Sequence, residues 1–527
     1  MPPPAIRTSI AVEAVQLLSD AVSAGTPLPE TVPASLDPVD GGDPTLRRRW
    51  LVLFLALAPL AVTWSLVNPM LASPDETIHI LRAQSIAAGD FSNPFTSDGL
   101  PMEAIECLQF QPEVTADCLD LTWGPDGTQQ IGPTDGYPPL YHSIAAIPAL
   151  FTSGLAGAYL MRIWMAVIVM ALIAWAGALA SRPRAGPWPL TGVVVAVTPM
   201  AIFCVATVNP SGMAVASALL FVVGAVSVLD TRWSGREVVA ATAVGAFGLA
   251  LSRRDGLLWL SVLAIVLAPF WIPQVRQLWS RRTARSTWTV VGVAAALLLV
   301  AAVWGRPTIS RFGQNWQDGA GTSWWEAAKF LRGYLSQVVG MLGWLDSPIG
   351  EEAVWVALVI GGFLVLMGIA SDNRRAALAT TLGLVALLVS PIVIGMIRFP
   401  YLQGRYLLPV WIGTAVLAGA AAARGDTGPR FDRRATRLVL GVWAIIHLIA
   451  GLQNLRRYAV GRSGSWNFLF DAEWNPPTMP NSVAVAAYVG TTALAAGGIL
   501  RALRLADQHA VVERPEASAP ESADVDG

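Results

Sequence analysis

The stretch RRRWLVLFLALAPLAVTWSLV, residues 47–67, decides the fold, because a cluster of three arginines leads directly into an uncharged apolar segment. A helix needs roughly 20 apolar residues to cross the hydrocarbon core of a membrane, and residues 50–67 come close to that length. Arginines gather on the cytoplasmic side of membrane helices. We therefore predict a first membrane-spanning helix at 50–67, with an extracytoplasmic segment after it.

The rest of the chain repeats this pattern. Of the 527 residues, 54% are hydrophobic and 13% are charged, whereas a soluble domain carries about 25% charged residues. Further apolar runs lie at 157–180, 188–208, 212–229, 238–251, 256–272, 288–305, 352–370, 376–397, 407–423, 438–452 and 483–500. We predict an all-α polytopic membrane protein with about 12 (roughly 11 to 13) transmembrane helices. The shorter apolar segment at 137–151 is predicted to be a partial helix.

The arginines between the runs agree with this topology. Most fall in loops that the topology places in the cytoplasm, namely the loops that contain Arg182, Arg232, Arg276, Arg374 and Arg424. Arg253 and Arg254 instead fall at the outer boundary, where they indicate either a miscounted helix pair or an anion site. The tails at 1–46 and 506–527 are polar, and we expect both to be disordered and cytoplasmic around a domain at 47–505 in the plasma membrane.

Three long segments are predicted on the extracytoplasmic face, at 68–136, 306–350 and 456–481. Loops that are held on a rigid scaffold tend to carry binding and catalytic residues, so we expect the protein to work at this face. The first of these loops contains eleven acidic residues and a single basic one, Arg82. It also contains Cys107 and Cys118, for which an oxidising exterior predicts a disulfide.

The sequence SPDETIH at 73–79 follows directly on the first span. On a helix that starts near Pro74, Asp75 and His79 share a face, and Arg82 lies near both. A carboxylate, an imidazole and a guanidinium in this arrangement can act as a general base, bind a divalent cation, or form an ion-paired surface helix. Spacing alone leaves all three interpretations open.

Other polar residues lie at the predicted outer ends of the spans. Arg162 is inside an apolar run, where a charge is costly unless it faces a partner, and a phosphate would satisfy it. The remaining candidates are Tyr141, Asn209, Asp346, Arg405 and Tyr406.

Taken together, these motifs resemble a bacterial family of predicted membrane proteins of undefined function that is placed in the GT-C glycosyltransferase superfamily. The resemblance rests on Pro74-Asp75-Glu76 with His79, Tyr137-Pro138-Pro139-Leu140-Tyr141, Asn209-Pro210, Gly343-Trp344-Leu345-Asp346 and Gln403-Gly404-Arg405-Tyr406-Leu407-Leu408-Pro409.

The resemblance implies a GT-C-like fold, a polyprenyl-phosphate sugar donor, a glycan acceptor of the cell envelope and an acidic catalytic base. On this chain the base would be Asp75, with Glu76 as the alternative. The departing lipid phosphate would be met by Arg162, Arg405 or Arg254. His79, Arg82, Tyr141, Asn209, Asp346 and Tyr406 complete the predicted substrate site. Some superfamily members use a divalent cation and others do not, so the resemblance makes no prediction about a metal.

Two other functions compete with this one. A transporter or flippase of a lipid-linked glycan would place ionisable groups near the middle of the membrane, often on broken helices. A glycan polymerase or ligase would share the outer site but use a later loop. The sequence contains neither a Walker A pattern nor a dinucleotide-binding glycine fingerprint, which disfavours a nucleotide-sugar enzyme. The expected partners are membrane lipid, lipid-linked sugar and glycan, and no nucleic acid.

Overall fold

The computed structural model describes residues 45–90, 96–97, 102–122, 129–130, 137–182, 185–229, 235–280, 292, 299, 322–398, 402–425 and 427–512. These residues are mostly helical. The α-helices are α2 (Leu46–Val67), α3 (Glu76–Ala87), α4 (Leu140–Ala145), α5 (Gly154–Ala180), α6 (Trp188–Ala196), α7 (Pro199–Val205), α8 (Pro210–Leu229), α9 (Arg236–Ser252), α10 (Gly256–Val266), α11 (Ala268–Ser280), α14 (Trp324–Lys329), α15 (Leu331–Gly340), α16 (Glu351–Ile369), α17 (Arg374–Arg398), α18 (Leu408–Ala422), α19 (Pro429–Val460) and α20 (Asn481–Val512).

Short elements occupy the connections. The 3-10 helices are η1 (Met102–Ile105), η2 (Ala116–Cys118), η3 (Ile147–Leu150) and η4 (Gly404–Leu407). Two antiparallel strand pairs are present, β1 (Thr96–Ser97) with β2 (Gln129–Gln130), and β3 (Met341–Leu342) with β4 (Ser347–Pro348). In the second pair Met341 lies opposite Pro348, which closes a tight turn over Gly343–Asp346.

The prediction of an all-α polytopic membrane protein is confirmed. Within the described part of the chain, eight helices are long and apolar enough to cross a membrane, or up to ten if the bent pairs α6–α7 (66°) and α10–α11 (72°) each form one span. The predicted span at 238–251 corresponds to α9, which has only 17 residues. Apart from residues 292 and 299, the predicted span at 288–305 lies outside the described residues, so the total of about twelve stays a prediction.

One of two further predictions is confirmed, and the other differs from the structure. The segment at 137–151 forms only the short helices α4 and η3, as expected for a partial helix. The last helix, however, continues to Val512, beyond the predicted boundary at 505. Its final turns remain amphipathic, because Arg501 and Arg504 are exposed while Leu505 and Ala506 are buried, so packing extends the helix into the predicted tail.

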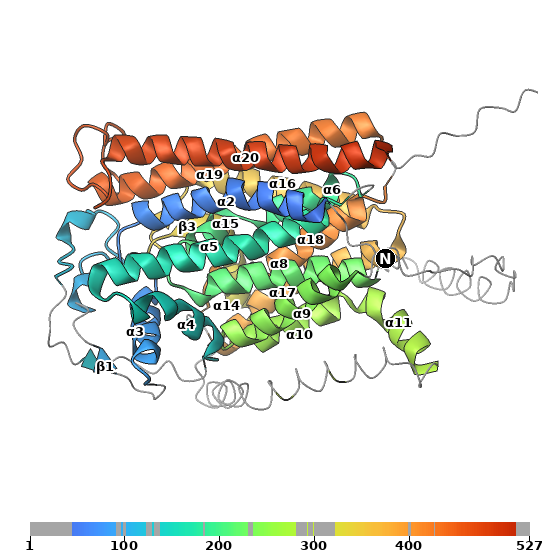
Figure 1. The fold of residues 1–527 in the computed structure, drawn as a ribbon, viewed down its shortest axis with the longest axis horizontal. Coiled ribbons are helices and arrows are strands. Elements are labelled where there is room, and N and C mark those ends of the chain that lie inside the picture. The colour runs from blue at the N-terminus through green and yellow to red at the C-terminus, as the bar shows by residue number, and fades with distance from the viewer. Residues whose placement is uncertain are drawn as a thin grey trace, which may run out of the picture. The chain divides into compact units, whose positions relative to one another are not determined.

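Close helix packing brings the spans together (Figure 1). Helix α2 packs between α5 and α20, and α18 packs against α6. The α6–α18 contact depends on two glycines, since a Cβ on Gly192 would lie 2.7 Å from the Ala415 carbonyl oxygen and one on Gly419 would lie 2.9 Å from the Cα of Gly192. Small residues allow such close approach between membrane helices.

The break between α6 and α7 is stabilised by tryptophans. A broken helix leaves backbone carbonyls unpaired, which is costly in lipid unless neighbours bond to them. Trp443 donates its indole N–H to the Val197 carbonyl (2.9 Å), and Trp411 donates to the Val195 carbonyl (3.3 Å). Thr198 then caps the start of α7 by accepting from the Ala201 N–H (3.2 Å). The break is therefore stabilised by specific side-chain hydrogen bonds.

Candidate functional site

One region of the bundle contains the ends of some helices and the beginnings of others, and we name it the loop end. It lies where α2, α9 and α19 end and where α5, α8, α18 and α20 begin, at the left of Figure 1. Hydrogen bonds link these ends: Arg405 before α18 to Asp75 before α3, and Arg253 after α9 to Ser211 on α8. This arrangement agrees with the predicted alternation of spans, and it places Arg253 on the same end as Asp75.

Asp75 is a partly exposed carboxylate at the loop end. It occupies the N-cap position of α3 with a left-handed backbone (φ 64°), and its side chain makes no capping hydrogen bond. Its Oδ2 lies 2.5 Å from Nη2 of Arg405, and 40% of its side chain is exposed. The predicted helix therefore begins one residue after Asp75, and the carboxylate pairs with Arg405.

Arg405 is buried beneath this carboxylate, with 3% of its side chain exposed. Its Nη1 donates to the Pro74 carbonyl oxygen (3.1 Å), and Nη2 also lies 3.5 Å from the Tyr406 hydroxyl. Its Nε has no hydrogen-bond partner among the described residues. Arg405 thus holds both the backbone and the side chain at the start of α3.

Asn209 fixes the same backbone from the other side. Its Nδ2 donates to the Pro74 carbonyl oxygen (3.3 Å), and its Oδ1 accepts from the N–H of Ser211 (2.9 Å). The turn between α7 and α8 is therefore tied to the residue that precedes Asp75.

A second arginine, Arg253, packs against the ring of Tyr406. The guanidinium carbon of Arg253 is 4.6 Å from the centre of the Tyr406 ring, which is a cation–π contact. Arg253 also pairs with Asp255 (2.7 Å) and donates to the Ser211 hydroxyl (2.5 Å). These contacts argue against a miscounted helix pair, which would have placed Arg253 at the opposite ends of the helices, and the alternative of an anion site stays a prediction.

Two histidines form a neutral pair beside this cluster. Nδ1 of His79 lies 3.0 Å from Nε2 of His142, and the His79 ring meets the Tyr137 ring edge-on at 5.3 Å. Burial keeps the pKa of His79 well below its ordinary value, and the neighbouring His142 and nearby arginines lower this pKa further. Burial, together with Arg82, lowers the pKa of His142 to about 3. His79 therefore contacts an imidazole rather than the Asp75 carboxylate.

The histidine pair is surrounded by two tyrosines and two arginines, namely Tyr137, Tyr141, Arg82 and Arg254. Arg254 lies over the Tyr137 ring (4.8 Å), and burial raises the pKa of Tyr137 to about 12. Arg82 is buried, which lowers its pKa, although Asp90 partly offsets the effect. The Tyr141 ring meets both histidines, and its hydroxyl has no partner in the described part of the chain.

Glu76 lies in a very different environment from its neighbour Asp75. Its carboxylate is fully buried and binds Arg162 side-on, with Nε to Oε1 at 2.7 Å and Nη2 to Oε2 at 2.6 Å. Oε1 also accepts from the N–H of Val208 (3.0 Å). The pair links α3 to α5 and to the turn before α8.

All the N–H groups of the Arg162 side chain donate hydrogen bonds. Besides its two bonds to Glu76, it donates to the carbonyl oxygens of Ser65 (3.2 Å), Asn68 (2.8 Å) and Pro69 (2.8 Å). A guanidinium has five N–H groups, so these five bonds leave none for a phosphate. In this arrangement Arg162 holds the end of α2 against α3.

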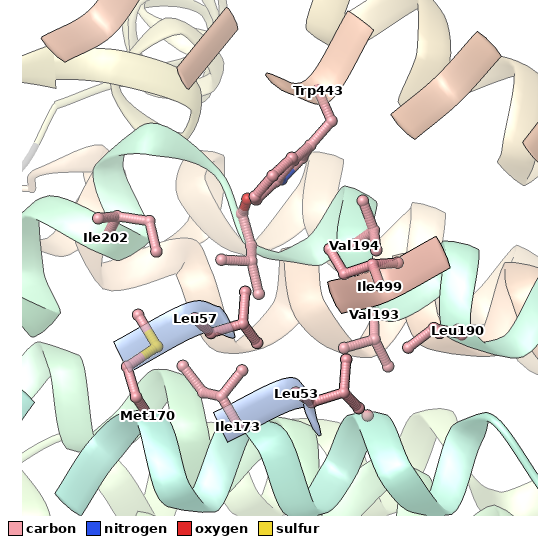
Figure 2. A pocket seen from close by; sticks show the side chains of 12 residues that line it. Leu53, Leu57, Met170, Ile173, Leu190, Val193, Val194, Ile202, Trp443 and Ile499 are labelled. Atoms are coloured by element: carbon pink, nitrogen blue, oxygen red, sulfur yellow. The ribbon is translucent and has the colours of Figure 1, made fainter. Parts of the chain in front are cut away.

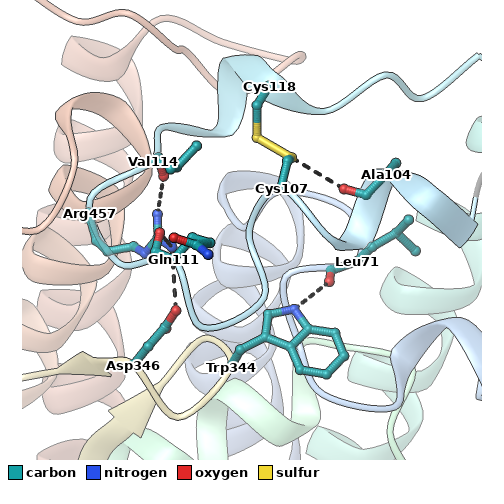
Figure 3. The surroundings of a disulfide bond; sticks show 9 residues. All are labelled: Leu71, Ala104, Cys107, Gln111, Val114, Cys118, Trp344, Asp346 and Arg457. Carbon is teal, nitrogen blue, oxygen red and sulfur yellow. Dashed lines mark hydrogen bonds and ion pairs between the residues drawn. A yellow bond between two sulfur atoms is a disulfide. The ribbon is translucent and has the colours of Figure 1, made fainter.

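Asp346 belongs to a separate part of the loop end (Figure 3). It lies 3.5 Å from Arg457 at the end of α19, and both side chains are buried. Arg457 also donates to the carbonyl oxygens of Val114 (2.5 Å) and Gln111 (2.8 Å), which lie between Cys107 and Cys118. These two cysteines form a disulfide, as the sequence pairs them.

An apolar pocket lies in the spans, away from these groups (Figure 2). Its walls come from α2, α5, α6, α7, α19 and α20 with the break between α6 and α7, and they include Leu53, Met170, Val194, Trp443 and Ile499. None of the predicted site residues lines it. The predicted site residues lie at the loop end instead.

The structure thus brings part of the predicted site together. Asp75, Arg405, Tyr406 and Asn209 gather at the start of α3, whereas Asp346 is held by Arg457. Sequence reasoning did not include Asp255, His142 or Arg457 among the site residues. His142 directly follows Tyr137–Tyr141, and Asp255 pairs with Arg253 only two positions away, so local sequence reasoning could have found both. The contacts of Arg457 instead involve residues far apart in the chain, which no local pattern reveals.

Fold and site together define a polytopic helical membrane protein with a buried-arginine cluster at one end of its helices. The chain belongs to the family described as predicted membrane protein (DUF2142), whose model matches residues 57–414. The predicted resemblance to such a family is thereby confirmed. No curated protein matches the sequence.

Solved structures with similar folds include ArnT from Cupriavidus metallidurans in the apo state, with a TM-score of 0.44 and 16% identity. The same protein bound to undecaprenyl phosphate gives a TM-score of 0.43 and 15% identity. Each comparison covers 87% of this chain and 76% of the ArnT chain.

Proposed function

We propose that this protein is a GT-C-type glycosyltransferase that transfers a sugar from a polyprenyl-phosphate donor to a glycan acceptor of the cell envelope. The observation that carries the proposal is an ion pair at the loop end between a partly exposed carboxylate, Asp75, and a buried arginine, Arg405. The family resemblance of the motifs around both residues supports the same reaction. In this proposal the loop end faces outward from the plasma membrane, and both termini are cytoplasmic.

The two residues have complementary roles in such a reaction. Asp75 takes the proton from the acceptor hydroxyl while that oxygen attacks the anomeric carbon of the donor sugar. The bond from this carbon to the phosphate oxygen breaks, and negative charge develops on the departing lipid phosphate. Arg405 stabilises that charge, because a guanidinium stays protonated and offers parallel donors to phosphate oxygens.

The lipid tail of the donor explains why such a site belongs at the end of the helices. The tail stays among the apolar spans while the phosphate reaches the surface, where the arginines lie. Arg253 keeps the Tyr406 ring in place through its cation–π contact, and Tyr406 in turn lies beside Arg405. We assign Arg253 and Tyr406 to positioning Arg405, and Asn209 to positioning Asp75.

Glu76 and Arg162 receive a structural role in this proposal. Their mutual bonds, together with the backbone bonds described above, use every donor of Arg162 and leave Glu76 fully buried. A base must reach the acceptor hydroxyl, which favours Asp75 over Glu76.

A transporter is the second candidate, because α6 and α7 form a broken helix and His447 is buried beside the break. Transporters bind substrate through the exposed backbone groups of broken helices. Here the carbonyls of Val195 and Val197 are already bonded to Trp411 and Trp443. These bonds favour a structural break and therefore the glycosyltransferase.

The test is sugar transfer from a polyprenyl-phosphate donor by the purified protein in vesicles. Asp75→Asn removes the negative charge but keeps the size of the side chain, and asparagine tolerates the left-handed backbone of this position. We expect turnover to fall by roughly 100-fold or more, the usual contribution of a general base. The thermal unfolding midpoint should stay unchanged.

Asp117→Asn is the matched control, because it removes an exposed carboxylate from the same loop. It should transfer sugar at the wild-type rate. Unchanged turnover in Asp75→Asn would exclude Asp75 as the base. If folded Glu76→Gln protein lost transfer while Asp75→Asn kept it, the base would be Glu76. Mass spectrometry of the lipid that copurifies with the protein identifies the donor class independently.

A further inference from the structure

The side-on edge of the Arg405 guanidinium is only half used. This edge carries Nε and one N–H of Nη2, which together match two oxygens of a carboxylate or phosphate. Asp75 takes Nη2 alone, at 2.5 Å, and Nε has no partner among the described residues although the side chain is 3% exposed. In the neighbouring pair, Glu76 occupies both positions of this edge on Arg162.

The backbone of Asp75 is held in a conformation that such a residue rarely adopts. Its φ of 64° lies in the left-handed region, which is unfavourable for a residue that has a Cβ atom. Its carboxylate also makes no capping bond to α3, although aspartate is among the best N-cap residues. The contact with Arg405 thus takes the carboxylate away from its usual capping role.

Arg405 itself is anchored independently of Asp75. Its Nη1 donates to the Pro74 carbonyl oxygen (3.1 Å), and its guanidinium lies against the Tyr406 ring (5.3 Å). When the Asp75 carboxylate leaves, these contacts keep the guanidinium where it is, with Nη2 released from Oδ2 and Nε still without a partner among the described residues.

We propose that the Asp75–Arg405 pair is exchangeable, so that the phosphate of the lipid-linked donor replaces the Asp75 carboxylate on Arg405 and thereby releases Asp75 as the base. This inference rests on the function proposed above and adds its regulation. No covalent bond changes in the exchange: one phosphate oxygen takes the place of Oδ2 on Nη2, and a second accepts from Nε. The Oδ2 atom that accepted from Nη2 is then free to accept a hydrogen bond from the acceptor hydroxyl, so the base becomes available when the donor is bound.

The exchange predicts that Asp75 competes with the donor for Arg405. Asp75→Asn should therefore bind polyprenyl phosphate more tightly than the wild type, by up to about fivefold, as expected for the loss of a partly exposed competing ion pair. Dissociation constants come from titration of the full-length purified protein with polyprenyl phosphate in detergent.

Two controls define the source of the effect. Neutral polyprenol should bind equally to the wild type and Asp75→Asn, since it has no phosphate, and Asp117→Asn should bind polyprenyl phosphate like the wild type. An equal gain for polyprenol, or no gain for polyprenyl phosphate, would overturn the exchange. A gain for inorganic phosphate but not for the lipid would overturn the assignment to a lipid headgroup. Asp75→Ser repeats the test with another uncharged N-cap residue if Asp75→Asn does not fold.

The exchange and the proposed function can fail separately. If the wild type transfers no sugar from any polyprenyl-phosphate donor but Asp75→Asn still gains affinity for polyprenyl phosphate, the function falls and the phosphate exchange stands. If the wild type transfers sugar and Asp75→Asn gains no affinity, only the exchange falls.

Discussion

Asp75 and Glu76 are neighbours in the chain, and each binds an arginine, yet the two pairs differ in nearly every physical respect. Glu76 is fully buried and fills the side-on edge of Arg162 with two bonds. Asp75 is 40% exposed and makes one bond to Arg405. One pair joins elements of the bundle, while the other leaves a carboxylate at the surface and a donor unused.

The two adjacent carboxylates therefore differ in what they can do: the buried pair holds the fold together, whereas the partly exposed pair can change its partner. A buried ion pair whose donors and acceptors are all satisfied resists any change of partner, because breaking it leaves an uncompensated charge in a medium of low dielectric. A partly exposed pair contributes little to stability and exchanges easily. The predictions below test whether this contrast holds in the protein itself.

The largest effect is expected when the buried pair is broken. Glu76→Gln leaves the Arg162 guanidinium buried without a counter-charge, which costs about 3–5 kcal/mol in measured cases. We expect a marked fall in the thermal unfolding midpoint of the purified protein. Arg162→Met should have a similar effect, because it leaves the Glu76 carboxylate buried and unpaired.

The matched control for this prediction is Asp75→Asn, which removes the same charge one residue earlier. Its unfolding midpoint should stay within the experimental error of the wild type. If Glu76→Gln and Asp75→Asn lowered the midpoint equally, the contrast between the two pairs would be wrong.

A third acid–arginine pair extends the comparison to the disulfide loop. Arg457 binds Asp346 loosely (3.5 Å) and donates to two carbonyls of the loop closed by Cys107 and Cys118, which are 11 positions apart. Replacing both cysteines by serine should destabilise the folded protein by about 2–3 kcal/mol, because the unfolded chain gains freedom. The unfolding midpoint of the oxidised protein measures the effect.

Treatment with a reductant supplies the control for the disulfide. It should lower the midpoint of the wild type to that of the double serine variant and leave the variant unchanged. A reductant effect of equal size on both proteins would show that the disulfide is not its cause.

Much of the fold was predictable because hydropathy and charge act locally along the chain. The run at 50–67 predicts α2 within a few residues, and the short segment at 137–151 was correctly separated from the spans. The bends in α6–α7 and α10–α11 were not predicted. The first depends on Trp411 and Trp443, which bond to the broken backbone from more than 200 positions away.

The candidate site was predictable in its residue types and not in their partners. The sequence places Asp75, Arg405 and Arg162 at the same ends of the spans, but it cannot tell which arginine binds which carboxylate. Arg162 was expected to meet a phosphate, and its partner in the structure is Glu76. His79 was grouped with Asp75 by helical spacing, but α3 begins after Asp75 and His79 turns toward His142.

The smallest expected effect concerns this histidine pair, which stays neutral between the charged groups compared above. Burial holds the pKa of His79 well below 6.5 and lowers the pKa of His142 to about 3. Between these values the unfolded chain binds more protons than the folded protein, so stability is complete above pH 6.5 and falls as the pH falls below it. The loss is at most about 1.4 kcal/mol per pH unit for each histidine.

The unfolding midpoint measured between pH 6.5 and pH 5 isolates this effect, because most carboxylates stay ionised in that range. His142→Gln keeps a hydrogen-bonding side chain but does not titrate, so its midpoint should depend less on pH than that of the wild type. Equal slopes for the two proteins would mean that His142 is protonated in the folded state. The histidine pair would then be a further charged site at the loop end, and the contrast between Asp75 and Glu76 would no longer account for the electrostatics of this region.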